Sequence, residues 1–271
     1  MSLGVVIKGP DGIVLAADSR VTLEAQMAGQ PHPFSVNFDN AIKTLSFSKE
    51  PHNFVGAVTY GIAGIGIPPR TAHSFLPEFE ISLEEKKNRL PVLEYSKQLS
   101  SFFMLQWEKA KMPKDYEGPN MTFVVGGYDE GKPYGDVFLF EIPGAPDPRE
   151  RHPNMFGMTW GGQLQIASRL IHGYDPKLLN ILEKELKLTK EQVQNLIPIL
   201  NTNLQFPIPY DVLPLQDCVN LALLLLRTTI SAQHLSVDVR GVGGDIEIAI
   251  ITRTAGLKYL QKKELHGEAR F

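Results

Sequence analysis

The sequence predicts an α+β protein, in which groups of short strands are separated by groups of helices. The first observation is an N-terminal pair of apolar strands, residues 3–8 and 13–17, joined by a Gly-Pro-Asp-Gly turn. The second is a pair of helical stretches, residues 68–87 and 91–111, each opened by proline. The third is a closing strand, residues 245–252, in which apolar and polar side chains alternate.

The N-terminal hairpin has a chemical consequence, because it brings Asp18 at the end of the second strand back beside residue 2. Removal of Met1 would leave Ser2 with a free α-amine, which titrates at about 7.7–8.0. Such a residue carries a nucleophilic hydroxyl and a base together, so no histidine is needed. The structural alternative is that serine is a common second residue and that the hairpin only ties down the end of the chain.

The run Gly-Ile-Val-Leu-Ala-Ala-Asp-Ser-Arg, which ends at Arg20, resembles the opening of a proteasome β-subunit or of the related bacterial peptidase HslV. Those enzymes begin with a processed threonine, form one strand, turn, and end the second strand in Ala-Ala-Asp-x-Arg. In this resemblance Ser2 occupies the position of the nucleophile and Asp18 that of the acid. The chain resembles a bacterial proteasome homologue more than a subunit with a cleaved propeptide, because only Met1 precedes Ser2 in this sequence.

Composition argues against several classes of function. A hydrophobic fraction of 43%, a charged fraction of 21% and a net charge of −3 describe an ordinary globular protein, and no basic block indicates nucleic-acid binding. No signal peptide is predicted, because the N-terminus lacks a basic segment followed by an apolar run of adequate length. No membrane span is predicted, because the longest apolar run, residues 221–226, is far below the ~20 residues needed. The single cysteine, Cys218, favours a cytoplasmic setting and is expected to be inert core. The seven histidines are scattered, so we expect neither metal nor cofactor.

The remaining elements follow in order along the 271 residues, which we interpret as a single domain with insertions near 22–41 and 175–213. Between residues 21 and 41, glycine and proline interrupt any helical or strand periodicity of apolar residues, which predicts a long loop. Strands resume afterwards, and the second half is predicted to contain a hairpin, a proline-rich loop, three helical regions and two closing strands. These elements cover residues 42–47, 53–60, 121–128, 135–142, 143–153, 163–172, 177–214, 215–233, 235–239 and 245–252. The polar tail from residue 257 is either a disordered end or a helix that docks on a neighbour.

The resemblance implies further site residues. Lys43 matches the invariant lysine of the family, because Lys-x-Leu-x-Phe precedes a strand that ends in glycine; Lys49 is the competing assignment. Gly61 matches the glycine that ends the next strand and whose N–H would stabilise an oxyanion. Thr22 falls at a position that pairs with the substrate backbone, and Thr59 near the wall of the specificity pocket.

The chain departs from the family at two serine positions. Trp160 stands where the family has a serine near the active site, so the proton relay of that serine is not carried over. Val242 and Val239 stand where proteasome β-subunits have serine and aspartate, and Asp238 would substitute only if the strand register slipped by one residue.

In this interpretation, Ser2 attacks and its α-amine takes the proton. Lys43 lowers the pKa of both groups because a nearby cation disfavours protonation, and Asp18 compensates the buried ammonium. The structural alternative for Asp18 and Lys43 is an ion pair without catalytic function.

The resemblance implies the four-layer αββα sandwich of N-terminal nucleophile hydrolases, with two sheets packed face to face and helices outside each. It also implies a homo-oligomer of stacked rings that hydrolyses peptides or unfolded proteins, with an unfoldase ATPase as an open further partner. Three alternatives remain: a non-catalytic ring subunit, an N-terminal nucleophile amidase that acts on a small molecule, and a self-processing hydrolase, which the lack of an encoded propeptide disfavours.

Overall fold

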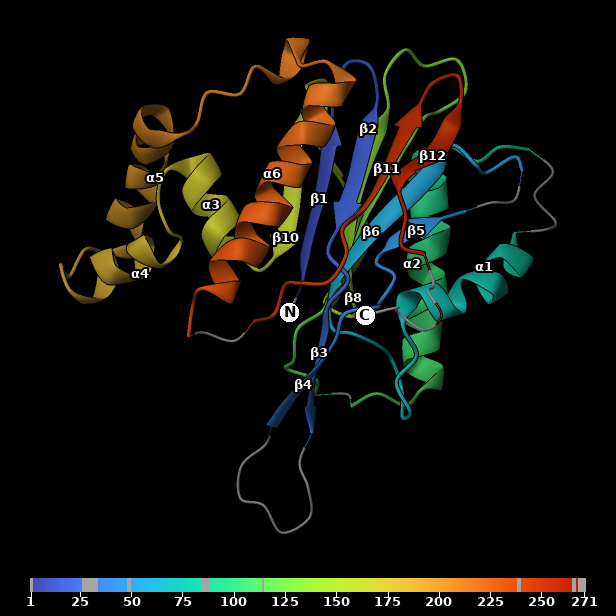
Figure 1. Cartoon of the computed structure of the whole chain (residues 1–271), viewed down its shortest axis with the longest axis horizontal. Helices are drawn as coiled ribbons and strands as arrows, with labels where there is room; N and C mark the ends of the chain where they lie inside the picture. The colour runs from blue at the N-terminus through green and yellow to red at the C-terminus, as the bar shows by residue number, and fades with distance from the viewer. Residues whose placement is uncertain are drawn as a thin grey trace.

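In a computed structural model, the chain is described for residues 2–25, 34–47, 50–83, 88–113, 115–237, 240–264 and 267. Within these residues the strands form three antiparallel sheets (Figure 1). The first sheet has the order β10-β1-β2-β11-β12, with β10 Gly157–Gly162, β1 Leu3–Lys8, β2 Ile13–Ala17, β11 Glu247–Thr252 and β12 Gly256–Gln261. The second has the order β5-β6-β7-β8-β9, with β5 Thr44–Ser46, β6 Val55–Gly61, β7 Met121–Gly127, β8 Asp136–Ile142 and β9 Ala145–Arg151. The third pairs β3 Val21–Ala25 with β4 Phe34–Phe38.

The N-terminal hairpin forms as predicted and lies inside the first sheet. Strand β1 pairs with β2 on one side and with β10 on the other, and the turn is closed by a 2.9 Å hydrogen bond from Gly9 N to Gly12 O. Every residue of β1 and β2 is buried, because both faces of the sheet are covered. Side chains alternate between these faces, so Leu3 packs toward the helices and Val6 toward the second sheet.

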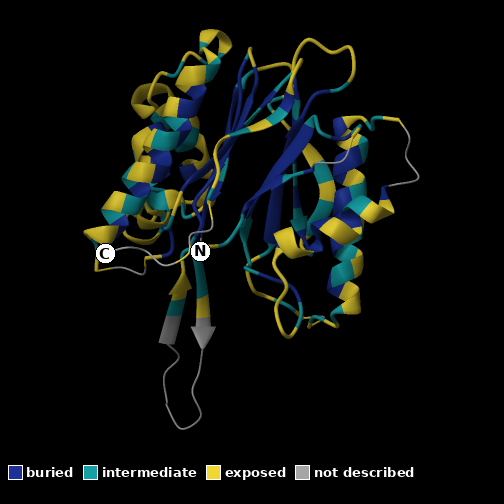
Figure 2. Cartoon of the chain, turned by 45° about the vertical axis from the view of Figure 1, so that its right-hand side comes forward, coloured by how far each residue is buried: buried dark blue, intermediate teal, exposed yellow. Residues whose placement is uncertain are grey.

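Helices cover the outer faces of the two large sheets (Figures 1 and 2). Helix α6 (Leu215–His234) and helix α3 (Leu164–His172) bury their apolar sides with β1 and β2. Helix α2 (Val92–Lys109), with α1 (Leu76–Ser82) and the 3₁₀ turn η1 (Ala72–Phe75), covers the second sheet. Between the two sheets, Val6, Leu15 and Val58 belong to a third apolar cluster.

The predicted four-layer αββα sandwich is wrong as a description of the architecture. Helix α5 (Lys190–Leu204) packs on α4 (Lys177–Lys184) and on α3, and Figure 1 shows α4 and α5 outside α3. The β3-β4 sheet adds a further element, which projects from the body of the molecule. These additions lie near the stretches 22–41 and 175–213, which the sequence analysis interprets as insertions. The interpretation of both stretches as insertions in a single domain stays a prediction.

Two predicted loops contain strands. The first is the glycine- and proline-rich region from residue 21 to 41, whose ends pair as β3 and β4; the turn between them lies outside the described residues. The second is the proline-rich region 143–153, which contains β9. Strand β9 lies at the edge of its sheet, where Pro146 and Pro148 can be accommodated because an edge strand does not need every N–H for pairing. Local composition did not reveal either pairing.

Three smaller predictions also differ from the structure. The helix predicted for residues 68–87 begins as η1 after the N-cap Thr71, and α1 ends at Ser82. Residues 235–237 are not in a strand, and Asp238 and Val239 lie outside the described residues. The first part of the tail, predicted as disordered or helical, includes the closing strand β12. Among the described residues, the helices are all too short or too polar to cross a membrane.

Candidate functional site

The hairpin places Asp18 beside the start of β1, as the sequence predicts. Leu3 N donates a 2.9 Å hydrogen bond to Asp18 Oδ1, and Asp18 N donates a 3.3 Å bond to Leu3 O. Ser2 is buried, with an exposed fraction of 6%, and its carbonyl oxygen accepts a 2.7 Å bond from Gln163 N at the start of α3. The peptide group that joins Ser2 to Leu3 is therefore held at both its oxygen and its nitrogen by hydrogen bonds from other elements.

The Asp18 carboxylate is fully enclosed by donors. Besides Leu3 N, it accepts a 3.1 Å bond from Arg20 N and a 3.0 Å bond from Gly243 N. Lys43 Nζ lies 2.8 Å from Asp18 Oδ1 and 2.5 Å from the carbonyl oxygen of Arg20. A buried carboxylate with three amide donors and an ammonium has its charge compensated locally. The carboxylate thus fixes the position of Lys43.

The electrostatics of Lys43 are set by two opposed effects. Burial lowers the pKa of the Lys43 ammonium, because a charged group is poorly solvated inside the protein, and the Asp18 carboxylate raises it in part. The net result is a pKa below the ordinary value of lysine. Lys43 is thus a cation whose proton is held less tightly than usual.

One cleft gathers five of the six predicted site residues, with Asp18 lying behind Lys43. The cleft encloses about 420 Å³ of empty space, including its open mouth. The predicted residues on its wall are Ser2, Thr22, Lys43, Thr59 and Gly61. The rest of the lining is mainly apolar and consists of Val21, Ala41, Ile42, Tyr60, Ile62, Ala63, Thr71, Ala72 and Met121. The structure therefore brings residues from β1, β3, β6 and the start of β5 to one place.

Gly61 is the position in the cleft that tolerates only glycine. Its φ is +98°, a conformation that L side chains rarely adopt, and a Cβ atom there would lie 1.9 Å from Asn120 O. The following residue, Ile62, donates a 3.1 Å hydrogen bond to the same oxygen. The end of β6 is consequently drawn close against the start of β7.

The two threonines occupy different walls. Thr22 belongs to β3, and its Oγ1 donates a 2.8 Å hydrogen bond to Asn37 Oδ1 on the partner strand β4. Thr59 belongs to β6, and its backbone N–H donates a 2.9 Å bond to Lys43 O. Thr59 therefore ties the strand that ends in Gly61 to the residue that carries the ammonium.

Trp160 does not lie in the cleft, contrary to the expectation that its ring would stand near the active site. In β10 the neighbouring Gly161 faces the cleft side, because a Cβ atom there would lie 2.2 Å from the ring of Tyr60. Trp160 points to the other face, where its ring centroid is 5.2 Å from that of His172. Val242 is fully buried in the cluster under α6, and its N–H donates a 2.8 Å bond to Gln233 Oε1.

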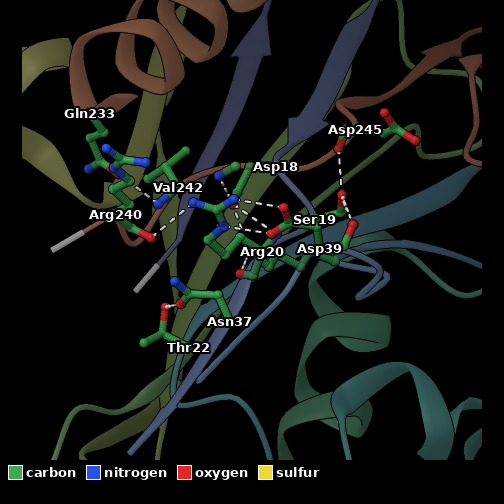
Figure 3. Close-up of polar contacts among 12 residues, drawn as sticks. Asp18, Ser19, Arg20, Thr22, Asn37, Asp39, Gln233, Arg240, Val242 and Asp245 are labelled. Carbon is green, nitrogen blue, oxygen red and sulfur yellow. Dashed lines mark hydrogen bonds and ion pairs between the residues drawn. The ribbon is translucent and has the colours of Figure 1, made fainter. Parts of the chain in front are cut away.

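A second polar group around Arg20 was not predicted (Figure 3). The Arg20 guanidinium makes two bonds to the Asp39 carboxylate, of 2.5 Å and 2.7 Å, and a 3.2 Å bond to Arg240 O. This pairing raises the pKa of Arg20 and lowers the pKa of Asp39. Ser19 Oγ donates to the carbonyl oxygens of Asp39 and Asp245, at 3.0 Å and 2.7 Å.

The signal for this group was the Asp-Ser-Arg sequence that follows β2, but its partners are remote in the chain. Asp39 comes 19 residues after Arg20 and the Gly241–Gly244 turn more than 200 residues after it. Gly243 is needed at the contact, since a Cβ atom there would lie 2.5 Å from Arg20 Cζ. The alternative lysine, Lys49, lies outside the described residues. Within the described part of the chain, no group of three or more His, Cys, Asp or Glu side chains is arranged to hold a metal ion.

Solved structures of Anbu proteins are similar to this chain. No protein-family model matches the chain, and no curated protein matches its sequence. An Anbu (Gly-1) mutant from Hyphomicrobium sp. strain MC1 is similar with a TM-score of 0.56 and 14% identity, covering 97% of this chain and 86% of that one. The subunit in a helical assembly of the Anbu complex from Pseudomonas aeruginosa gives a TM-score of 0.56 and 16% identity, covering 97% and 88%. Anbu (ancestral beta-subunit) from Yersinia bercovieri gives a TM-score of 0.52 and 16% identity, and the match covers 96% of this chain and 87% of that one.

These likenesses show the fold, which is proteasome-like. They also correct the resemblance drawn from the N-terminal motif. Structures that match along nearly the whole chain include Anbu proteins, a proteasome-like but distinct family, so the assignment to a proteasome β-subunit or HslV type is wrong. The short motif did not separate these families, because it covers only the hairpin and its following residues.

Proposed function

We propose that this chain is an N-terminal nucleophile hydrolase that cleaves peptide bonds with Ser2 after removal of Met1. The observation that carries the proposal is the shared cleft, in which Ser2 lies with Lys43 and Gly61 in front of the buried Asp18 carboxylate. A buried lysine with a lowered pKa in a cleft is a typical feature of a functional site. The proteasome-like fold of the Anbu neighbours agrees with this class of chemistry.

Each residue has a role in the proposed reaction. The Ser2 hydroxyl attacks the carbonyl carbon of the substrate, and the α-amine of the same residue takes its proton. The Lys43 ammonium disfavours protonation of that amine and so keeps it available as a base near neutral pH. Gly61 contributes its N–H to the oxyanion, an interaction worth about 2.7–4 kcal/mol in related chemistry. The protonated α-amine then gives its proton to the leaving amine as the peptide C–N bond breaks, and water hydrolyses the resulting ester of Ser2 to release the acid and restore the free hydroxyl.

We further propose that copies of the chain assemble, so that the substrates are peptides or unfolded polypeptides that enter the assembly. Support comes from the Pseudomonas aeruginosa neighbour, which forms a helical assembly. The ring predicted from the sequence and an open helical array differ only in whether successive rotations close. Electron microscopy of the purified protein distinguishes them.

The decisive experiment measures intact mass before and after incubation with a peptide epoxyketone, a reagent that needs a hydroxyl and a free α-amine on one residue. We expect loss of Met1 and one adduct per chain. Ser2→Ala removes the hydroxyl and abolishes the adduct, whereas Ser2→Thr keeps the hydroxyl and retains it. Retained Met1 with no adduct would reject the hydrolase and leave a non-catalytic subunit, for which the Asp18–Lys43 pair is purely structural. An adduct on a monomeric protein that cleaves only small amides would favour the amidase instead.

A further inference from the structure

Strand β1 carries polar side chains at both of its ends on the same face. Residues 2, 4, 6 and 8 alternate toward the second sheet, as the contacts of Gly4 and Val6 with that sheet show. Ser2 precedes the strand and Lys8 ends it, so the two lie about 20 Å apart at opposite ends of the space between the sheets. In Figure 1, β1 runs from the end marked N to the far edge of the molecule.

Lys8 is a buried ammonium without a buried counter-charge. The residue has an exposed fraction of only 5%, and its Nζ donates a 3.0 Å hydrogen bond to His152 O. An ammonium has three donors. No carboxylate of the described chain lies within ion-pair distance of this one, in contrast to Lys43, whose partner is Asp18. A buried cation in this state favours an additional acceptor of negative charge.

A surface pocket opens directly over Lys8. One wall is apolar: the rings of Tyr134 and Phe156 meet edge to face with centroids 5.1 Å apart, and the adjoining Met155 is 57% exposed. The space amounts to about 820 Å³, including its open mouth. Such a pocket has room for a side chain of moderate size beside a small anionic group.

Most of the other charged side chains at the pocket already form ion pairs. Lys132 lies 2.8 Å from Asp129 and 2.8 Å from Asp136, so these two carboxylates already have a cationic partner. Glu150 on β9 also lines the pocket and is exposed. Lys8 therefore remains the buried charge that an incoming group can pair with, and Glu150 opposes an anion from the rim.

We propose that this pocket binds a carboxylate attached to an apolar group, specifically the free C-terminus of a peptide whose last side chain is apolar. The carboxylate pairs with the Lys8 ammonium, and the last side chain packs against Tyr134, Met155 and Phe156. A charge-assisted hydrogen bond in a buried position is stronger than a neutral one, which gives the pocket a preference for the free acid over an amide. The site is distinct from the cleft of Ser2 and does not depend on hydrolysis.

The test uses the full chain with Ser2→Ala, so that no probe is consumed, and isothermal titration with N-acetyl-Ala-Phe as the free acid and as the C-terminal amide. We expect the acid to bind and the amide to bind at least about tenfold more weakly. Lys8→Met keeps the apolar stem and should weaken binding of the acid by a similar factor. Lys258→Met, at an exposed lysine of β12, is the control and should leave the affinity for the acid unchanged.

Glu150→Gln should change the affinity for the acid in the opposite direction. Removal of the rim carboxylate should tighten binding of the acid about threefold, because an exposed charge interacts weakly but measurably. This variant leaves Lys8 in place, so it serves as the test if Lys8→Met does not fold. Equal binding of acid and amide, no binding of the acid at millimolar concentration, or an unchanged affinity in a folded Lys8→Met variant would overturn the proposal.

Discussion

Lys43 Nζ and Asp18 Oδ1 are 2.8 Å apart, and their side chains are 6% and 0% exposed. The pair joins the end of β2 to the residue that precedes β5, so it connects the two large sheets at the cleft. Because three amide groups share the same carboxylate, its loss affects more than one ion pair. Stability and the proposed chemistry therefore depend on the same two side chains.

Asp18→Ala should lower the free energy of unfolding by about 3–5 kcal/mol, because it leaves a buried ammonium and three amides without their acceptor. Urea denaturation followed by circular dichroism measures this. Adding Lys43→Met should recover part of the loss, since the uncompensated charge is then gone. Glu78→Ala is the control: its exposed pair with Arg70 should contribute at most about 1 kcal/mol. A loss at Asp18 as small as that of the control would contradict the prediction.

Gly61→Ala should destabilise the protein by several kcal/mol or displace the wall of the cleft, because the new Cβ atom would meet Asn120 O at 1.9 Å. Gly131→Ala is a matched control, since its φ of +80° is similar and nothing lies within 4 Å of the added atom. The control should cost only about 1 kcal/mol for the left-handed conformation. Thermal and urea denaturation of both variants measure the loss of stability. Equal losses in the two variants would show that the backbone at Asn120 moves away from the new Cβ atom with little loss of stability.

Glu247 should make stability depend on pH. It is 1% exposed on β11, and burial raises the pKa of its carboxyl group above 4.5, an effect that the charge of Lys263 only partly offsets. A raised folded-state pKa means that the folded protein binds the proton more tightly. The resulting stability is complete below the unfolded pKa and is lost as the pH rises through the folded pKa.

Glu247→Gln removes this titration while it keeps the shape of the side chain. Relative to the parent protein, the variant should gain stability as the pH rises from about 4.5, by at most about 1.4 kcal/mol per pH unit. Urea denaturation at a series of pH values measures the difference. A difference that stays constant from pH 4 to 8 would show that Glu247 titrates normally.

Cys218 should be unreactive in the folded protein. Its side chain lies on the buried face of α6 and is fully buried, and burial raises the pKa of the thiol to about 11, so almost none of it is thiolate at pH 8. A chromogenic disulfide reagent should therefore react with one equivalent of thiol in urea and far more slowly in buffer. Rapid reaction under native conditions would indicate that the region around α6 opens readily.

The elements that could be predicted from the sequence are those whose partners are close in the chain. The N-terminal hairpin needs only its turn and two apolar runs, and it alone brings Asp18 to the start of β1. Lys43, which the motif around it singled out, pairs with Asp18 in the structure. Strands β3 and β9 were missed, because glycine and proline suppress the local signal and only pairing with β4 and β8 stabilises them.

The sequence by itself determined a chain end in which Ser2, Asp18 and the following Arg20 are held by local strand geometry. Only the tertiary structure decided what surrounds them: the pairing of Arg20 with Asp39, the amide of Gly243 on Asp18, and the direction of Trp160 away from the cleft. It also decided the architecture, in which α4, α5 and the β3-β4 sheet extend beyond the two large sheets and their covering helices. The physical reason is that turns and alternation act over a few residues, whereas burial, hydrogen bonding and charge compensation are satisfied between segments up to 226 residues apart.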